Sequence, residues 1–278
     1  MTATTRDAVN QAVSTPWVSA VLTSPQARSF GTYVFSFFTL FLLWHIMATY
    51  IFPSVLFSPP LAVFKKAVEL TASGVLLTDI AVSMKRILLG FAIGSALGFP
   101  IGLLMGNVRF FRRLFEPYTE FFRFIPAIAL LTLAVIWFGI GEASKVAFIT
   151  YAAFFPIFTT TIEGIKYVDP ILIRAASSLG ASERQIFWHV VLPAATPNII
   201  TGMRLAFGLS FFVIVAAEFI AADSGLGFLI NDARTFFLVS NMLLGAAVIG
   251  IIGVLANVLL RKLEGRLLRW RKESRGQA

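Results

Sequence analysis

Long apolar segments constrain the fold of this sequence more than any other feature. Runs of about 18 or more apolar residues are typical of helices that cross a bilayer, and several occur among the 278 residues of the chain. Hydrophobic residues make up 58% of the sequence and charged residues only 13%, against about 25% charged residues in soluble domains. We therefore expect lipid to surround most of the chain, and we expect an all-α integral membrane fold.

About six membrane-spanning helices are predicted from these runs. They cover residues 32–52, 87–106, 124–140, 146–162, 199–221 and 237–260. With the N-terminus inside, 16 Lys and Arg residues fall on the inner side and six on the outer side. Because the inner loops of membrane proteins are enriched in basic residues, both termini are predicted to be cytoplasmic.

Three regions follow from this topology. We expect a cytoplasmic tail over residues 1–31, a membrane domain over 32–260 and a basic cytoplasmic tail over 261–278. Residues 53–86 are expected to hold an outer loop and a helix at the membrane surface. The net charge of +9 is explained by the topology signal, so no nucleic-acid partner is predicted.

The residue types that most enzymes need are sparse. The chain has no Cys, and its two His residues, His45 and His189, lie far apart in the sequence. Thiol catalysis and Cys-ligated metal are thereby excluded, and a zinc site is not expected. No G-x-x-x-x-G-K-[ST] phosphate loop occurs either. We therefore predict no catalytic residue, metal or cofactor in this chain, and ATP hydrolysis would need another protein.

A stripe of glycines at every fourth position marks the second predicted span. These are Gly90, Gly94, Gly98, Gly102 and Gly106. Residues four apart share one helix face, and small residues let another helix approach closely in lipid. The stripe is expected either to pack against a helix of the same subunit or to provide a surface along which helices slide.

The stretch RAASSLGASERQIFWHVVLP, residues 174–193, is too polar for the middle of a bilayer. Asp169 followed by a proline predicts a helix start, and Gly180 predicts its end. Ser182 and Gln185 have the spacing of a capping box, which predicts a second helix. Leu192-Pro193 is expected to end that second helix.

Both short helices are amphipathic, and their apolar faces are expected to pack on the membrane bundle. These faces consist of Ile171, Leu172, Ala175, Ala176 and Leu179 in the first helix and Ile186, Phe187, Val190 and Val191 in the second. The segment could simply connect two spans. A connector between bundled helices needs only about 2–8 residues, however, whereas this one uses roughly 35. A rigid projection that inserts into a groove of a soluble partner is the alternative.

This stretch resembles the EAA loop of the permease subunits of binding-protein-dependent ABC importers. The positions in register with that pattern are Ala175, Ala176, Gly180, Val190, Leu192 and Pro193. Arg174 departs from the pattern, because the family usually has Glu there. The resemblance covers about residues 55–270 and is to the group that serves sulfonates, taurine, nitrate or bicarbonate. IWFGIGEASK, residues 136–145, is more similar to the sulfonate and taurine members.

The resemblance implies a type I ABC importer permease fold whose coupling loop, residues 164–197, lies in the cytoplasm. It implies a homodimer in a bacterial inner membrane, two ATPase subunits that bind ATP-Mg, and an external solute-binding protein. The expected cargo is a small anion, and the binding protein makes much of the selection. The expected ATPase-coupling residues are Ala175, Ala176, Gly180, Ala181, Ser182, Glu183, Leu192 and Pro193.

Two charged residues of the fifth predicted span are candidate pathway residues. Arg204 is expected either to reach the cytoplasmic interface or to attract an anionic substrate. Glu218 is expected to pair with a nearby cation or backbone group rather than to bind substrate. The outer loop 222–234 is expected to form a re-entrant turn or a docking surface for the binding protein.

Two other functional classes are weighed against the permease. A self-sufficient secondary transporter or channel would show inverted repeats and coupling-ion carboxylates near the membrane midplane. An intramembrane enzyme would need a nucleophile and a base at membrane depth. Neither pattern is visible in the sequence, and a permease driven by separate ATPases is the expected function.

Overall fold

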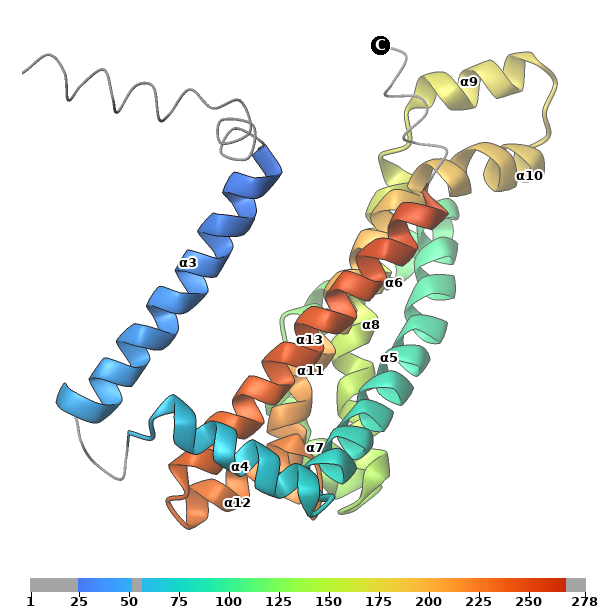
Figure 1. The fold of residues 1–278 in the computed structure, drawn as a ribbon. Coiled ribbons are helices and arrows are strands. Elements are labelled where there is room, and N and C mark those ends of the chain that lie inside the picture. The colour runs from blue at the N-terminus through green and yellow to red at the C-terminus, as the bar shows by residue number, and fades with distance from the viewer. Residues whose placement is uncertain (1–24, 52–56, 269–278) are drawn as a thin grey trace, which may run out of the picture. The chain divides into compact units, whose positions relative to one another are not determined.

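The computed structural model describes residues 25–51 and 57–268, and every regular element in these ranges is a helix (Figure 1). The chain divides into two compact units, residues 1–64 and residues 65–278, which are described separately. The predicted tails, 1–31 and 261–278, lie largely outside the described residues.

The first unit contains the first predicted span. Helix α3 (Pro25–Ile46) continues into a π-helical turn, η1 (Met47–Ile51). The helix thus begins seven residues before the predicted start of the span, at a proline, which is well suited to the first turn of a helix. The indole nitrogen of Trp44 donates to the carbonyl of Ser58 (3.1 Å), which ties the helix to the segment that follows it. Helix α4 (Pro60–Ala72) lies in the segment for which a helix at the membrane surface was predicted.

Three long helices form the centre of the second unit. They are α5 (Val75–Asn107), α8 (Glu142–Lys166) and α11 (Leu192–Ala221), and α8 packs along both of the others. The 33 residues of α5 extend over about 50 Å, which is longer than the roughly 30 Å hydrocarbon core of a bilayer. Residues 75–86 were predicted to belong to the outer segment 53–86, but they form the first turns of α5.

The glycine stripe of α5 faces α8 of the same chain, and all five glycines are buried. A Cβ atom added at any of the five would lie 2.6–2.9 Å from an atom of α8, closer than packed carbon atoms normally approach. Only glycine allows the two helix backbones to lie so near each other, which gains dispersion contacts in lipid. This geometry supports the packing alternative for the stripe.

The third predicted span is a helix that follows another helix after a sharp bend. Helix α6 (Arg109–Arg123) and helix α7 (Ala127–Phe138) meet at an angle of 96°. Helix α7 alone corresponds to the third predicted span, and α6 occupies the connection between the second and third predicted spans. Pro126 separates the two helices, because the residue before a proline is disfavoured in α-helical geometry.

Two more helices complete the second unit. Helix α12 (Leu226–Thr235) follows α11, and helix α13 (Val239–Leu267) runs back along the bundle (Figure 1). Four of the described helical segments are long and apolar enough to cross a membrane, or up to five if α6 and α7 form one span. The apolar part of α3, Phe35–Ile51, is shorter. An all-helical membrane fold is confirmed.

Candidate functional site

The segment between α8 and α11 forms two short helices that lie at one end of the bundle (Figure 1). The first is α9 (Pro170–Ser178). The Asp169 carboxylate accepts a hydrogen bond from the backbone N–H of Ile171 (2.8 Å), as predicted for its N-cap. Gly180 ends the helix with φ +81°. The N–H of Ala181 donates to the carbonyl of Ala176 (3.1 Å), which is the Schellman closure that glycine favours.

The second helix begins at the predicted capping box. The N–H of Ser182 donates to the side-chain oxygen of Gln185 (2.8 Å), and the N–H of Gln185 donates to the hydroxyl of Ser182 (3.4 Å). Helix α10 (Glu183–Ile186) then continues into a π-helical turn, η2 (Phe187–Val191). Residues 169–191 are called the elbow below.

The predicted end of this second helix is wrong. Leu192 and Pro193 do not stop it but form the first turn of α11. A proline is tolerated there because its missing N–H interrupts little in the first turn of a helix. The π-helical turn just before it is a common site of local helix irregularity. In Figure 1, α10 lies across the end of the bundle whereas α11 runs along it.

The predicted apolar underside of α9 is also wrong. Ile171, Leu172 and Leu179 are 62%, 48% and 88% exposed, and Ala175 is exposed as well. These four residues, called the elbow surface, share one helix face. Instead, α9 contacts the bundle through Ile173, which packs on a cluster that includes Ile165, Val191 and Ile199.

The second short helix packs as predicted. Ile186 and Phe187 lie on the same apolar cluster, and Val191 is buried within it. The elbow is therefore held on the bundle by its second helix while the apolar face of the first remains uncovered. An exposed apolar face of this kind marks a site of interaction with another protein or with membrane.

The remaining predicted coupling residues surround this surface. Ser182, Glu183 and Pro193 are exposed, whereas Ala176, Ala181 and Leu192 are half-buried. Arg174 is exposed on α9. The charge that replaces the usual Glu of the EAA pattern is therefore open to solvent.

A buried charge cluster lies near the other end of the bundle. The Arg86 guanidinium is 1% exposed and donates to the Glu218 carboxylate, which is fully buried (2.7 Å). It also donates two hydrogen bonds to Glu142 at the start of α8 (2.8 and 2.5 Å). Lys145, which is 3% exposed, lies 3.4 Å from the same Glu142 carboxylate. Helices α5, α8 and α11 are thereby joined by charged groups.

Backbone groups of the turn between α11 and α12 complete the cluster. The N–H of Gly227 donates to Glu218 (2.7 Å) and the N–H of Gly225 donates to Asp79 (2.8 Å). Ser83 donates to Glu218 (2.8 Å) and accepts from the N–H of Leu226 (2.9 Å). Because a Cβ atom at Gly225 would contact the Glu218 carboxylate, the turn lies directly on that side chain. The cluster thus fixes the start of α12.

The two candidate pathway residues have protein partners in this structure. Glu218 is part of the charge cluster, in line with its expected structural pairing. Arg204 donates to Glu264 of α13 (2.8 Å), and the two side chains are 31% and 23% exposed. Arg204 therefore lies level with the basic end of α13.

The sequence reasoning did not foresee the other members of the charge cluster that contains Glu218. Asp79, Ser83 and Arg86 fall before the predicted second span, and Glu142 falls before the fourth. The available signal was a set of charged residues at the ends of several apolar runs. Pairing them required the three-dimensional arrangement of the helices.

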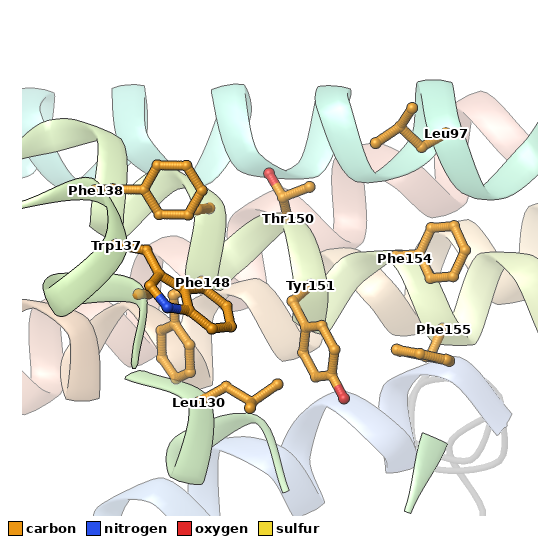
Figure 2. A pocket seen from close by; sticks show the side chains of 11 residues that line it. Leu97, Leu130, Trp137, Phe138, Phe148, Thr150, Tyr151, Phe154 and Phe155 are labelled. Carbon is orange, nitrogen blue, oxygen red and sulfur yellow. The ribbon is translucent and has the colours of Figure 1, made fainter. Parts of the chain in front are cut away.

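An apolar cavity of about 390 Å³ lies between α5, α7 and α8 (Figure 2). Its polar side chains already bond to the backbone: the hydroxyl of Tyr151 donates to the carbonyl of Phe122 (2.7 Å), and that of Thr150 to the carbonyl of Gly90 (3.3 Å). No charged residue lines it. Its walls are formed by Leu97, Leu130, Ala134, Trp137, Phe138, Ala147, Phe148, Thr150, Tyr151, Phe154 and Phe155.

These features define a multi-pass membrane protein with a capped, exposed elbow at one end of its bundle and a buried charge cluster near the other. Comparison with known proteins gives the family. Residues 98–270 match the family described as binding-protein-dependent transport system inner membrane component. The chain belongs to this family, and it is a non-catalytic membrane component of an ABC importer.

Several relatives match most of the chain. The taurine transport system permease protein TauC of Escherichia coli strain K12 is 38% identical over 255 residues, which cover 90% of this chain and 93% of the relative. The aliphatic sulfonates transport permease protein SsuC of Bacillus subtilis strain 168 is 36% identical over 208 residues, 75% of each chain.

A solved structure shares the fold. The inward-facing MetNI methionine ABC transporter superposes with a TM-score of 0.58 at 19% identity, over 70% of this chain and 95% of the matched chain. The resemblance on which the permease prediction rested is therefore confirmed, and so is the fold. The chain is a multi-pass inner-membrane permease.

Proposed function

We propose that this permease transports a small organic sulfonate, with taurine-like compounds as the favoured substrates. The names of the relatives support this class, because one is named for taurine transport and another for aliphatic sulfonate transport. A formylaminopyrimidine permease, 30% identical over 237 residues, marks a different substrate class at a lower identity. Nitrate and bicarbonate are the other members of the expected anion group.

Two copies of the chain would enclose the pathway at a two-fold axis, since most soluble and membrane homo-oligomers form closed symmetric assemblies. An external binding protein would deliver the solute. Two ATPase subunits would bind ATP-Mg, and both termini and the elbow would face the cytoplasm. The basic residues near the end of α13, among them Arg261, Lys262 and Arg266, agree with this orientation.

The observation that carries the coupling proposal is the uncovered elbow surface. Ile171, Leu172 and Leu179 are exposed on a helix that is rigidly capped at both ends. Such a helix suits insertion into a groove on an ATPase subunit, as in helix-in-groove recognition. Closure of two ATPases would then move two elbows together, and the movement would pass through η2 into α11.

The charge cluster is assigned no substrate role in this scheme. Arg86 is 1% exposed and is bonded to two carboxylates and a backbone carbonyl. A guanidinium so fully engaged has little capacity to bind an incoming anion. Substrate choice would then depend chiefly on the binding protein.

The test is a reconstitution of the permease with the ATPase and binding protein of its own transport system. Gly180→Val places a β-branched residue at φ +81° and should reshape the turn. ATP hydrolysis should then proceed with little or no taurine uptake, while the purified permease stays folded. Gly180→Asn is the matched control, because Asn tolerates this conformation, and it should keep uptake near the wild-type level.

Two results would count against the proposal. Full coupled uptake by Gly180→Val would show that coupling does not depend on the shape of the elbow. Transport of some other solute, with no response to any sulfonate, would leave the coupling intact but overturn the substrate class.

A further inference from the structure

A long groove runs between α11 and α13, on a face of the bundle that neither the elbow nor the charge cluster reaches. Its volume is about 880 Å³. Most of the wall is apolar, but one end carries Arg204, Asn257 and Arg261. We propose that this groove holds an acidic phospholipid, with the phosphate at the two arginines and an acyl chain along the apolar wall.

The basic end of the groove matches an anionic headgroup. Among the described residues, the one ion pair of Arg204 uses a single nitrogen, Nη1, on Glu264. Arg261 is exposed and forms no ion pair with any residue that the structure describes. Since a guanidinium has five N–H donors in a planar fork, both groups retain donors for a phosphate. Basic pockets between membrane helices bind acidic lipid headgroups by this chemistry.

The length of the groove matches an acyl chain. From Arg204 to Val215 the lining of α11 extends over 12 residues, or about 17 Å at a rise of 1.5 Å from one residue to the next. From Arg261 to Ala246 the lining of α13 extends over 16 residues, or about 22 Å. One leaflet of the hydrocarbon core is roughly 15 Å deep. A short sulfonate would occupy only the basic end and leave the apolar length empty.

The groove is open along its side and has a smooth floor. Leu205, Phe212 and Val254 in its wall are 54%, 78% and 64% exposed. A Cβ atom at Gly208 or Gly250 would meet no atom within 4 Å, so these two glycines border empty space. An acyl chain can therefore enter from the side and lie over the glycines.

Four variants test the site by blocking it or removing its charge. Gly250→Leu fills the floor, and Gly265→Leu is its control on the same helix, since a Cβ there also meets no atom within 4 Å but does not line the groove. Arg261→Gln removes one charge, and Lys262→Gln is its neighbouring control. Gly208→Leu fills the groove from the opposite wall, in case Gly250→Leu fails to fold.

The measurement is native mass spectrometry of each purified permease during titration with dioleoylphosphatidylglycerol or dioleoylphosphatidylcholine. The wild type should bind phosphatidylglycerol more tightly, by about fivefold for each basic group that contacts the phosphate. Arg261→Gln should lose about fivefold of that preference. Gly250→Leu and Gly208→Leu should lose the bound lipid, whereas both controls should retain it.

Four results would overturn the proposal. One is equal binding of the two lipids by the wild type. Another is retention of phosphatidylglycerol by both glycine-to-leucine groove variants. The third is displacement of the lipid by millimolar hexanesulfonate, which would assign the groove to a sulfonate. The fourth is loss of the dimer in the groove variants, which would assign the groove to a second copy.

Discussion

The elbow and the charge cluster lie toward opposite ends of one bundle and are built on opposite principles. The elbow is held by hydrogen bonds between residues two to five positions apart, such as Ile171 to Asp169 and Ala181 to Ala176. The cluster is held by bonds between residues far apart, such as Arg86 to Glu142 and Arg86 to Glu218. The first region is mostly exposed, whereas the second is buried except for Glu142, whose side chain is 58% exposed.

This difference indicates what each region can do. Locally capped helices keep their shape without further contacts, so the elbow can leave its apolar face uncovered for a partner. The cluster joins α5, α8, α11 and the start of α12 through charged groups that would be costly to separate in a buried site. We therefore expect the elbow to transmit movement and the cluster to hold its end of the bundle together.

The largest effect on stability is expected from Glu218→Ala. Removing this carboxylate leaves the buried Arg86 with one fewer counter-ion, and it leaves the Gly227 N–H and the Ser83 hydroxyl without their acceptor. The expected loss is about 3–5 kcal/mol in the free energy of unfolding, measured by denaturant titration in detergent. Glu264→Ala is the control, since its pair with Arg204 is partly exposed and should cost no more than about 1 kcal/mol. Equal losses would contradict the structural role of the cluster.

Replacing one turn glycine in each region by alanine compares how much stability the two turns contribute. Gly225 has φ +118° and directly faces the Glu218 carboxylate, whereas Gly180 has φ +81° and open space around it. Gly180→Ala should cost about 1–2 kcal/mol for the left-handed backbone alone. Gly225→Ala should cost more, because about 1–3 kcal/mol of backbone strain adds to displacement of the carboxylate. A larger loss in the free energy of unfolding for Gly180→Ala than for Gly225→Ala, in the same denaturant titration, would contradict this expectation.

Removal of a cap should affect the elbow alone. Ser182→Ala removes the side-chain half of the capping box, which is worth about 1 kcal/mol. Amide hydrogen exchange should speed up within residues 183–191 and remain unchanged in α5 and α8. Ser178→Ala, at an exposed position near the end of α9, should leave both regions unchanged. Faster exchange throughout the bundle would show that the elbow is not an independent local unit.

The smallest effect on stability is expected from a substitution on the elbow surface. Leu179 is 88% exposed, so Leu179→Ala should change the free energy of unfolding by less than about 0.5 kcal/mol. Ile199 is 4% exposed and belongs to the apolar cluster on which the elbow packs. Ile199→Ala should therefore cost about 2–5 kcal/mol. A large loss for Leu179→Ala would mean that the elbow surface is covered by the permease itself.

The same contrast explains what the sequence alone could predict. The caps at Asp169, Gly180 and Ser182 were predictable, because each involves residues within a few positions of one another. The long apolar runs and the glycine stripe likewise carry their own periodicity. Their physical causes act over one or two helical turns.

Long-range contacts explain what could not be predicted. Nothing near Glu218 in the sequence reveals that Arg86 and Ser83, from a helix that begins at residue 75, surround it. The amphipathic face of α9 was recognised, but periodicity does not tell whether a face lies on its own bundle or awaits a partner.

The most direct test of the central claim asks on which side of the membrane the elbow lies and whether an ATPase covers it. The chain has no Cys, so Leu179→Cys and Asp232→Cys each introduce a single thiol at an exposed position. A membrane-impermeant maleimide should label Leu179→Cys only in inside-out vesicles, and the bound ATPase should block that labelling. It should label Asp232→Cys only in right-side-out vesicles. Labelling of Leu179→Cys from the outer side, or labelling that the ATPase leaves unchanged, would contradict the account.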